Sequence, residues 1–447
     1  MSASVIESSL FKDIFGTDEM RKIWDDLNTV QKWLDVEAAL ARAQAKLGII
    51  PEAYANEISK KARVELIDMD ELKRGIDKTT HPLMPLVRVF RTVCAGDAGE
   101  FIHWGATTQD IMDTGLVLQI KESLELVEPC LSAVNKTLKH MASEHKDTVM
   151  AGRTHGQHAL PITFGYKVAV WQKEITRHLT RLEQVKKRVL IGQFAGAVGT
   201  LASMGSGGLE VQELMFRELG LEVPDIAWHA SRDSLAELVC VLGMISATLG
   251  KIANEVVTLQ KTEYGELEEP FEMGMVGSST MPHKRNPMTS ESVVAISKMV
   301  RCNVPLAIEA MVGEFERDMR TWQTEWKFVG ESFILLSGAI RSINRVLQRL
   351  YINVGQMRSN VYMTKGLILS EAIMLKLGEK IGRQKAHDLV YKICMKAYEE
   401  DMPLQDALMQ EPSILGELTP QEIEAIMDPV SYTGLSSYFA EKASEET

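Results

Sequence analysis

The distribution of proline constrains the fold of this chain more than any other feature of its sequence. The 447 residues include 14 prolines, and none of them falls within 162–223, 225–269 or 306–402. Because proline disrupts helix interiors, and because apolar residues recur in these windows at three- and four-residue spacing, the windows predict long helices. Alternating patterns long enough to predict a strand do not occur. We therefore expect an all-α fold.

Two segments give the clearest helical patterns. The first begins with Asp113 and Thr114 as candidate N-cap residues and contains Pro129, where we expect a kink. Its apolar stripe consists of Leu116, Ile120, Leu124, Val127, Leu131, Val134, Leu138 and Met141. The second, 231–261, is apolar around most of its circumference, which predicts a core helix at the centre of a bundle in an oligomer. No apolar run in the chain is long enough to predict a membrane span.

The length of the chain predicts two or three structural units that a long helical bundle ties together. Soft boundaries fall near residues 110 and 357. We expect an N-terminal helical domain at 1–110, a central bundle of long helices at 111–357 and a smaller helical C-terminal domain at 358–447.

Charge and cysteine content exclude several classes of function. The net charge of -12 and the pI near 5.5 argue against nucleic acid as a partner, because binding to phosphates needs a basic face. The N-terminal residues lack the basic and apolar blocks of a secretory signal, so we expect a cytoplasmic protein. The five cysteines lie far apart and include no CxxC, which predicts reduced, buried thiols rather than disulfides or a metal site.

Polar segments interrupt the helical pattern at four places. His81, in "KTTHPLMP", is either a capping or a functional histidine. In "FIHWGATTQDIMDTG", residues 107–110 precede a long helix and suit either an anion site or plain capping. In "GRTHGQHALP", His155 and His158 flank a glycine, which favours a catalytic histidine because a metal site would need more ligands.

The fourth segment, "GMVGSSTMPHKRNPMTSES" at 274–292, is a long polar loop without an apolar period. Lys284 and Asn286 offer a cation and an amide for a carboxylate, and serine amides flanked by glycine can stabilise negative charge. The spacing does not match a phosphate-binding loop or the G-x-S-x-G turn of a hydrolase. The segment therefore predicts an anion-binding loop without naming a reaction.

The motif "GSSTMPHKRNP" at 277–287 resembles the signature loop of the fumarase/aspartase superfamily. "HWGATTQD" and "GRTHGQHA" resemble its other two conserved regions, in the same order along the chain. The resemblance implies a homotetramer of long helices with a central bundle of about twenty helices, in which each active site takes one region from each of three subunits. It also implies a small polycarboxylate substrate and chemistry that needs no metal and no organic cofactor.

The resemblance assigns roles to individual residues. Ser278 is similar to the general base that removes a proton beside a carboxylate, and Lys284 and Asn286 match the residues that stabilise the resulting aci-carboxylate. His155 matches the general acid of adenylosuccinate lyase, His81 a second histidine of that enzyme, and Glu325 the glutamate that pairs with the acid. The remaining implied substrate contacts are Thr107, Thr108, Gln109, Thr154, Gln157, Ser279, Met281 and Arg232.

Two members of the superfamily compete for the closer resemblance. His81 and "THGQHA" are similar to adenylosuccinate lyase, whereas "GATTQDIMDTGLVLQ" and the segment 322–326 resemble 3-carboxy-cis,cis-muconate cycloisomerase. Trp322, Gln323 and Trp326 stand where the nucleotide enzyme holds a phosphate, which argues against a purine nucleotide and predicts apolar walls there. His155 favours a carbon–nitrogen lyase that releases fumarate from an N-substituted aspartate or other succinyl compound.

A non-catalytic relative, like the lens crystallins that resemble argininosuccinate lyase, is the alternative from another class. The residues expected to act as base, acid and anion ligands are all present, which favours an enzyme: Ser278, His155, Lys284, Asn286 and Glu325.

Overall fold

The computed structural model describes every residue except 1–3, 272–273, 275–276 and 446–447. Most of its described residues are helical, as the proline windows predicted. The residues form two compact units. The first comprises Met1–Leu131, His178–Gly250 and Ala295–Arg341, and the second comprises Ser132–Arg177, Lys251–Val294 and Ser342–Thr447. The three-domain division near residues 110 and 357 stays a prediction.

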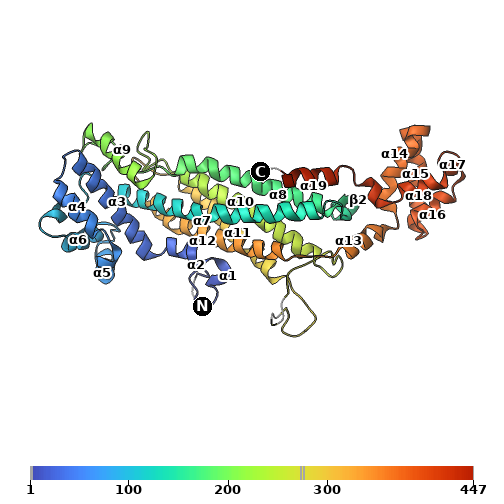
Figure 1. The fold of residues 1–447 in the computed structure, drawn as a ribbon, viewed down its shortest axis with the longest axis horizontal. Helices are drawn as coiled ribbons and strands as arrows, with labels where there is room; N and C mark the ends of the chain where they lie inside the picture. Colours follow the sequence, from blue (N-terminus) through green and yellow to red (C-terminus); the bar gives the residue numbers. More distant parts are fainter. Residues whose placement is uncertain (1–3, 272–273, 275–276, 446–447) are drawn as a thin grey trace. The chain divides into compact units, whose positions relative to one another are not determined.

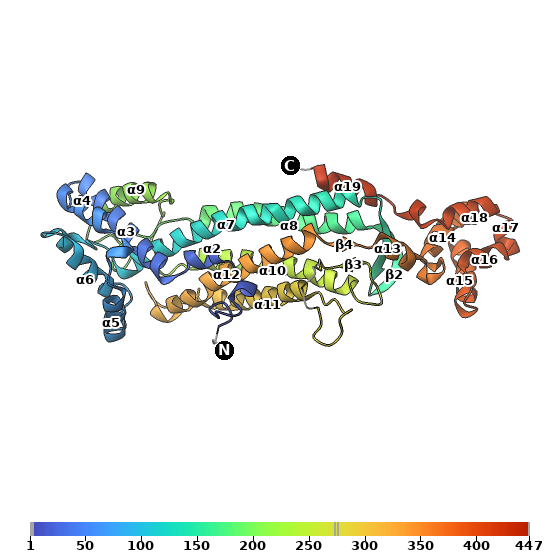
Figure 2. The ribbon, with the colours of Figure 1, turned by 60° about the horizontal axis from the view of Figure 1, so that its bottom comes forward.

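Five long helices contribute residues to both units. They are α7 (Thr108–Glu144), α8 (Phe164–Val189), α10 (Asp233–Leu259), α11 (Met288–Glu309) and α12 (Met319–Gln348). Within the first unit, the parts of these helices lie side by side (Figures 1 and 2). Buried polar contacts join neighbours there, such as His178 Nε2 to Thr248 Oγ1 at 2.9 Å between α8 and α10.

The apolar patterns of two long helices fit the positions of their side chains. Seven of the eight stripe residues on α7 are buried, Leu116 being the half-buried one. Helix α10 is long and apolar enough to cross a membrane by length and composition, yet 72% of its most apolar window is buried inside the protein. It is packed as a core helix, which is the arrangement expected from its uniformly apolar surface.

The start of α7 differs from the expectation. The helix begins at Thr108 rather than after Asp113, so Asp113 and Thr114 are buried helical residues and not N-caps. The pattern was misleading because Gln109 and Asp110, in the first turn, are polar but fully buried. Pro129 lies inside the helix as expected.

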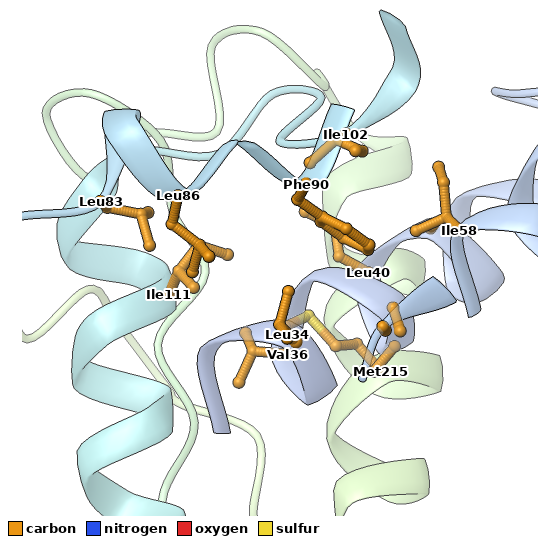
Figure 3. Packing of buried hydrophobic residues seen from close by; sticks show 14 of the residues in the cluster. Leu34, Val36, Leu40, Ile58, Leu83, Leu86, Phe90, Ile102, Ile111 and Met215 are labelled. Carbon is orange, nitrogen blue, oxygen red and sulfur yellow. The ribbon is translucent and has the colours of Figure 1, made fainter. Parts of the chain in front are cut away.

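The first unit has one apolar core among its shorter helices, from α3 onward. Its other helices are α1 (Lys12–Phe15), α2 (Asp18–Ile23), α3 (Asp26–Lys46), α4 (Glu52–Lys61), α5 (Met69–Thr79), α6 (Met84–Val93) and α9 (Gly207–Leu219), with 3-10 turns at Val64–Leu66 and Ala98–Phe101. Figure 3 shows side chains from α3, α6, α7 and α9 meeting in this core, among them Leu40, Phe90, Ile111 and Met215. This core supports the N-terminal end of α7.

The second unit holds a separate apolar core made by C-terminal helices. The helices are α13 (Val354–Val361), α14 (Ser370–Ile381), α15 (Arg383–Glu399), α16 (Leu404–Met409), α17 (Pro412–Leu415), α18 (Pro420–Ile426) and α19 (Ser436–Glu445), with 3-10 turns at Tyr362–Thr364, Leu367–Leu369 and Pro429–Tyr432. A short ladder pairs β3 (Leu267–Glu268) with β4 (Tyr351–Ile352).

A β-hairpin in the second unit corrects the expectation that no strand of useful length occurs. The strands β1 (Val149–Thr154) and β2 (Gln157–Thr163) pair antiparallel. Glycine, proline and polar residues obscure the alternation, and the register shifts between Ala151 and Arg153. A side chain at Gly152 would lie 2.7 Å from the carbonyl oxygen of Leu160, so the shift needs glycine.

The cysteines correct a second expectation. All five are free thiols, but none is buried: Cys94, Cys240 and Cys394 are half-buried, and Cys130 and Cys302 are exposed.

Candidate active site

Two of the predicted substrate ligands lie at the N-terminal end of α7, within the first unit. Thr108 Oγ1 lies 3.3 Å from Nε2 of His81, so the chain brings together two residues that are 27 positions apart. The hydroxyl of Thr107 accepts a hydrogen bond of 2.6 Å from Arg317. A guanidinium therefore joins the predicted ligands. Arg317 was not among the site residues predicted from the sequence, although it lies only five positions before Trp322.

The protonation state of His81 follows from its contacts. The backbone N–H of Met84 donates to Nδ1 of His81 at 3.1 Å, so the neutral ring carries its proton on Nε2, toward Thr108. Burial lowers the pKa of His81, and the nearby His103, Arg317 and Arg88 lower it further. His81 is thus suited to donate a hydrogen bond as a neutral group near pH 7.

Asp110 is the buried polar centre beneath these ligands. Its carboxylate accepts hydrogen bonds from the backbone N–H groups of Thr107, Ala195 and Gly196 at 2.9 to 3.0 Å, and Nε2 of His229 lies 2.8 Å away. This carboxylate fixes the first turn of α7. The capping interpretation of the segment therefore holds for Asp110.

Gln109, expected to contact substrate, is fully buried. Its side-chain amide donates to the carbonyl oxygen of His229 at 3.0 Å, while its Oε1 has no hydrogen-bond partner among the described protein atoms. In this arrangement Gln109 supports the His229 segment.

A second buried cluster joins α7, α12 and the residue before α10, also within the first unit. Arg232 donates two hydrogen bonds to Glu325, at 2.7 and 2.5 Å, and two to Asp113, at 2.8 and 3.0 Å. The indole N–H of Trp322 donates to Asp113 at 3.0 Å. Of the predicted site residues, Arg232 and Glu325 are therefore direct partners.

The two tryptophans of α12 differ from the expectation of two apolar walls. Trp322 is 5% exposed and belongs to the core, whereas Trp326 is 47% exposed and meets it edge-on at 5.4 Å between ring centroids. The expectation is wrong for Trp322, because its ring is buried in the core and its indole N–H donates to Asp113.

The second unit places His155 at the tip of the hairpin. The two-residue turn between Thr154 and Gln157 consists of His155 and Gly156, with φ angles of 53° and 76°. Positive φ at both positions is the type I′ geometry that matches the twist of paired strands. Thr154, His155 and Gln157 are all exposed, so the predicted acid and its neighbours project together from the hairpin.

A buried ion pair anchors this hairpin. Arg153 pairs with Glu266 at 2.6 Å, and the side chain of Glu266 is fully buried. The amide of Asn360 donates to the same carboxylate at 2.7 Å. Burial and the charge of Arg153 lower the pKa of His158, which supports a neutral ring there. Anchored in this way, the turn holds His155 on a defined support.

The signature loop, residues 277–287, lies in the second unit as well. The hydroxyl of Ser278 accepts hydrogen bonds from the backbone N–H groups of Thr280, at 3.4 Å, and Met281, at 3.1 Å. Amides directed at a serine oxygen stabilise negative charge on it, which is what a serine base requires. Ser279, Met281 and Lys284 are exposed along the same loop.

Several contacts fix the shape of the loop. Asn286 donates to the carbonyl oxygen of Gly277 at 2.7 Å, which closes the loop on itself. A side chain at position 277 would lie 2.4 Å from the carbonyl oxygen of Lys284, so the closure needs glycine. A cleft of about 210 Å³ lies against the loop, lined by Gln260, Glu269, Pro270, Phe271, Gly277, Arg285, Asn286 and Met288.

The predicted site residues thus fall into two groups within one chain. The first unit holds His81, Thr107, Thr108, Gln109, Arg232 and Glu325, and the second holds Thr154, His155, Gln157, Ser278, Ser279, Met281, Lys284 and Asn286. The expected pairing of Glu325 with His155 stays a prediction. Within the described residues, no group of three or more histidine, cysteine, aspartate or glutamate side chains is arranged to hold a metal ion.

Comparisons with known proteins agree with the motifs. A family model described as lyase matches residues 15–302, more than half of the chain, and one described as adenylosuccinate lyase C-terminus matches residues 366–443. An N-acetyl-S-(2-succino)cysteine lyase from Enterococcus italicus is 43% identical over 97% of this chain and 95% of its own length. An adenylosuccinate lyase from Methanocaldococcus jannaschii is 42% identical over 94% of this chain and 92% of its own length.

Solved structures give the same answer for the fold. A fumarate lyase from Mesorhizobium has a TM-score of 0.91 and 40% identity, covering 97% of this chain and 99% of its own. A 3-carboxy-cis,cis-muconate lactonizing enzyme from Pseudomonas putida has a TM-score of 0.92 and 36% identity, covering 98% of each chain.

The long helices, the signature loop and the histidine hairpin define a helical lyase. The chain belongs to the fumarase/aspartase superfamily, as the sequence predicted, and it is an enzyme.

Proposed function

We propose that this lyase releases fumarate by β-elimination from a small compound in which nitrogen or sulfur is bonded to C2 of a succinate. The observation that carries the proposal is the Ser278 hydroxyl, which accepts hydrogen bonds from two backbone amides in an exposed loop. A serine oxygen stabilised in this way can take a proton from the carbon beside a carboxylate.

The other roles follow from charge and position. Lys284 and Asn286, in the same loop, would hold the carboxylate while negative charge develops on it. His155, exposed at the hairpin tip, would protonate the leaving atom, and Glu325 of another subunit would hold its ring. The polar end of α7, with Thr107, Thr108 and Arg317, would bind a second carboxylate.

A purine nucleotide is not the substrate we propose, although adenylosuccinate lyase is among the relatives. The exposed Trp326 and Gln323 replace the phosphate ligands that the resemblance implies for the nucleotide enzyme. Nitrogen as the leaving atom is favoured by His155, because an amine is a poor leaving group unless it is protonated. Sulfur is favoured by the relative from Enterococcus italicus, whose name gives a succinylated thiol.

The test measures fumarate release from amino acids that carry a 2-succino group on nitrogen or on sulfur, and from adenylosuccinate, in wild type and in His155→Asn. Asparagine is chosen because it tolerates the left-handed backbone at position 155. We expect turnover of succinyl amino acids, little turnover of adenylosuccinate, and a loss in the variant of about 10²-fold or more for amines. The loss should be smaller for thiols, because a thiol ionises near pH 8.5 and can leave as a thiolate, whereas an amine that is not protonated would have to leave as a far more basic amide anion.

A cycloisomerase is the second candidate, favoured by the lactonizing enzyme of nearly identical fold. A carboxylate leaving group needs no proton from the enzyme, so lactone formation would not depend on His155. The same assay therefore includes carboxymuconate. Rapid lactonisation that survives His155→Asn, without carbon–nitrogen or carbon–sulfur cleavage by wild type, would assign the enzyme to this second class.

We also propose the assembly and the location. The enzyme would be a cytoplasmic homotetramer with three domains per chain, and each active site would combine the α7 end, the hairpin and the signature loop of three subunits. The support is that the predicted site residues fall into groups on separate parts of the chain, each group exposed at least in part. Light scattering on the active enzyme tests the tetramer, and an active monomer would contradict it.

A further inference from the structure

Arg285 lies between two residues of the proposed site, Lys284 and Asn286, and has no role in the proposed function. All three belong to the signature loop, and Lys284 and Arg285 are both exposed cations. A cation at this place either binds a substrate carboxylate, as proposed for Lys284, or holds the loop in shape. The contacts of the Arg285 side chain and backbone distinguish these two tasks.

The side chain of Arg285 contacts the segment that precedes the loop. We call this segment, residues 260–271, the stem. Nη1 of Arg285 donates to Oε1 of Glu268 at 2.6 Å, and the guanidinium carbon lies 4.9 Å from the ring centroid of Phe271. A guanidinium that has a carboxylate at its edge and an aromatic ring against its face is held in one orientation.

The backbone of Arg285 is attached to the stem as well. The side chain of Gln260 donates from Nε2 to the carbonyl oxygen of Arg285 at 3.0 Å, and its Oε1 accepts from the backbone N–H of Glu269 at 2.8 Å. With its amide reversed, Gln260 would set an acceptor against an acceptor and a donor against a donor, so its two partners determine its orientation. Gln260 therefore joins the backbone at residue 285 to the stem.

This attachment extends to the proposed base through one side chain. Asn286, the residue after Arg285, closes the loop by donating to the carbonyl oxygen of Gly277 at 2.7 Å. Gly277 directly precedes Ser278. The amide of Asn286 has a second hydrogen for a substrate carboxylate. The attachment to the stem thus sets the position of both neighbouring ligands and, through Asn286, of the backbone that carries Ser278.

The charge of Glu268 argues against a direct role of Arg285 in substrate binding. The Glu268 carboxylate accepts from Arg285, and because like charges repel, a substrate carboxylate that approached this guanidinium would compete with Glu268. The side chains of Arg285 and Glu268 are 53% and 31% exposed. Water screens a pair with this exposure, so we expect the pair to contribute little to the stability of the fold and to act on the shape of the loop.

We propose that Arg285 is a positioning residue that, together with Glu268 and Gln260, holds the signature loop in its active shape and does not bind substrate. The inference rests on the proposed function, in which this loop supplies the base and the ligands of the developing charge. Interactions that strengthen only in the transition state change kcat more than KM. Loss of the attachment to the stem should therefore lower kcat and leave KM nearly unchanged.

Glu268→Gln distinguishes the two tasks by the direction of its effect, because Glu268 lies outside the loop. If Arg285 positions the loop, removal of its charged partner lowers kcat by about twofold to fivefold, as expected for one exposed ion pair. If Arg285 were a substrate ligand, the same change would release the guanidinium and lower KM. The measurement is kcat and KM for fumarate release from a 2-succino amino acid that wild type turns over, in the assembled enzyme.

A double-mutant cycle adds Arg285→Met, which removes the charge and keeps an unbranched side chain at this position. Arg285→Met should lower kcat, with KM within about twofold of the wild-type value. In the Glu268→Gln background, the factor by which Arg285→Met lowers kcat should be about two to five times smaller, because the shared contact is already lost. Two factors that simply multiply would mean that the two residues act independently.

Gln260→Ala tests the backbone contact. It removes both hydrogen bonds of the side-chain amide, so kcat should fall about fivefold or more while KM stays within about twofold of the wild-type value. Gln31, in the first unit, provides the matched control. Its side chain donates to the carbonyl oxygen of Ala62 at 3.0 Å and accepts from the backbone N–H of Val64 at 2.8 Å. Gln31→Ala should leave kcat and KM unchanged.

A second ion pair controls for the loss of charge. Arg188 donates to Glu237 in the first unit, and their side chains are 53% and 38% exposed, close to the values for Arg285 and Glu268. Arg188→Met and Glu237→Gln repeat the two chemical changes and should leave kcat and KM unchanged. Circular dichroism and light scattering check that every variant folds and assembles.

Three results would overturn the inference: a lowered KM in Glu268→Gln, a raised KM with unchanged kcat in Arg285→Met, or factors that multiply in the double variant. Should Gln260→Ala fail to fold, the cycle of the partly exposed pair decides. If Ser278→Ala keeps its activity, the proposed function itself fails. An inactive Ser278→Ala beside a Glu268→Gln with the wild-type kcat removes the inference and leaves the proposed function intact.

Discussion

Ser278 is half-buried in the signature loop, and two backbone amides donate to its hydroxyl oxygen. Ser278→Ala removes the proposed base and leaves the loop contacts of Asn286 and Gly277 in place. Turnover should fall by several powers of ten, while thermal unfolding and assembly stay as in wild type. A variant that keeps a tenth of the wild-type kcat would contradict the assignment of the base.

His103 gives a prediction about stability. Nδ1 of His103 lies 2.7 Å from Glu37, and the backbone N–H of His103 donates to the same carboxylate at 3.0 Å. Burial alone would lower the pKa of His103, but the charge and hydrogen bond of Glu37 outweigh it, so the pKa is raised. A raised folded-state pKa stabilises the fold below the unfolded value of about 6.5, and this contribution is lost as pH rises through the folded pKa.

The measurement is urea unfolding of the wild type and Glu37→Gln at several pH values. The free energy of unfolding of the wild type should decrease above about pH 6.5 relative to the variant, in which the histidine loses its charged partner. The variant should also be less stable at low pH, by about 3 kcal/mol, because a buried ion pair has lost one partner. If the free energy of unfolding had the same pH dependence in both proteins, the proposed link between the pKa of His103 and stability would be contradicted.

At the scale of elements, the signature loop depends on the start of α11. Glu269 is buried and accepts hydrogen bonds from the backbone N–H groups of Thr289, at 2.9 Å, and Ser290, at 3.0 Å. Its carboxylate therefore caps the N-terminus of the helix that ends the loop. Glu269→Ala should lower the free energy of unfolding by about 1 to 2 kcal/mol and reduce kcat, because the loop loses its anchor.

Glu291 provides the control for this change. It is an exposed carboxylate in the first turn of the same helix. Glu291→Ala should change the free energy of unfolding by only a few tenths of a kcal/mol, which is about the contribution of one exposed charge near a helix end. Equal effects of the two substitutions on thermal unfolding and kcat would show that the cap does not anchor the loop.

Local sequence patterns predicted those elements whose pattern lies entirely within one segment of the chain. The stripe on α7, the apolar α10 and the polar loop at 277–287 are each readable within one segment, and the structure has them where expected. The hairpin was missed because Gly152, Pro161 and a register shift break its alternation. Residues whose surroundings come from distant segments were also missed, since Arg232 meets partners 119 and 93 positions away.

At the scale of the whole molecule, a shared active site predicts complementation. Ser278→Ala and His155→Asn should each be inactive as pure tetramers. In mixed tetramers, some sites receive a native Ser278 from one subunit and a native His155 from another. Random mixing in equal amounts should restore about a quarter of wild-type activity, measured after joint dissociation and reassembly.

A second mixture controls for activity that is regained without combining native residues from different subunits. Ser278 and Lys284 lie in one loop, so the same subunit always contributes both to a site. Mixing Ser278→Ala with Lys284→Ala should restore no activity. Equal recovery in both mixtures, or none in the first when mixed tetramers have formed, would contradict a site built from several subunits.

The left-handed backbone at His155 bears on how the enzyme could change in evolution. Both histidine codons become asparagine codons through substitution of a single base, and histidine and asparagine are among the non-glycine residues that adopt positive φ most readily. One point mutation could thus remove the acid while the turn keeps its shape. Loss of the proton donor would then lower the stability of the protein little. The hairpin tip is therefore a position at which an enzyme of this fold can change from a reaction that needs an acid to one that does not.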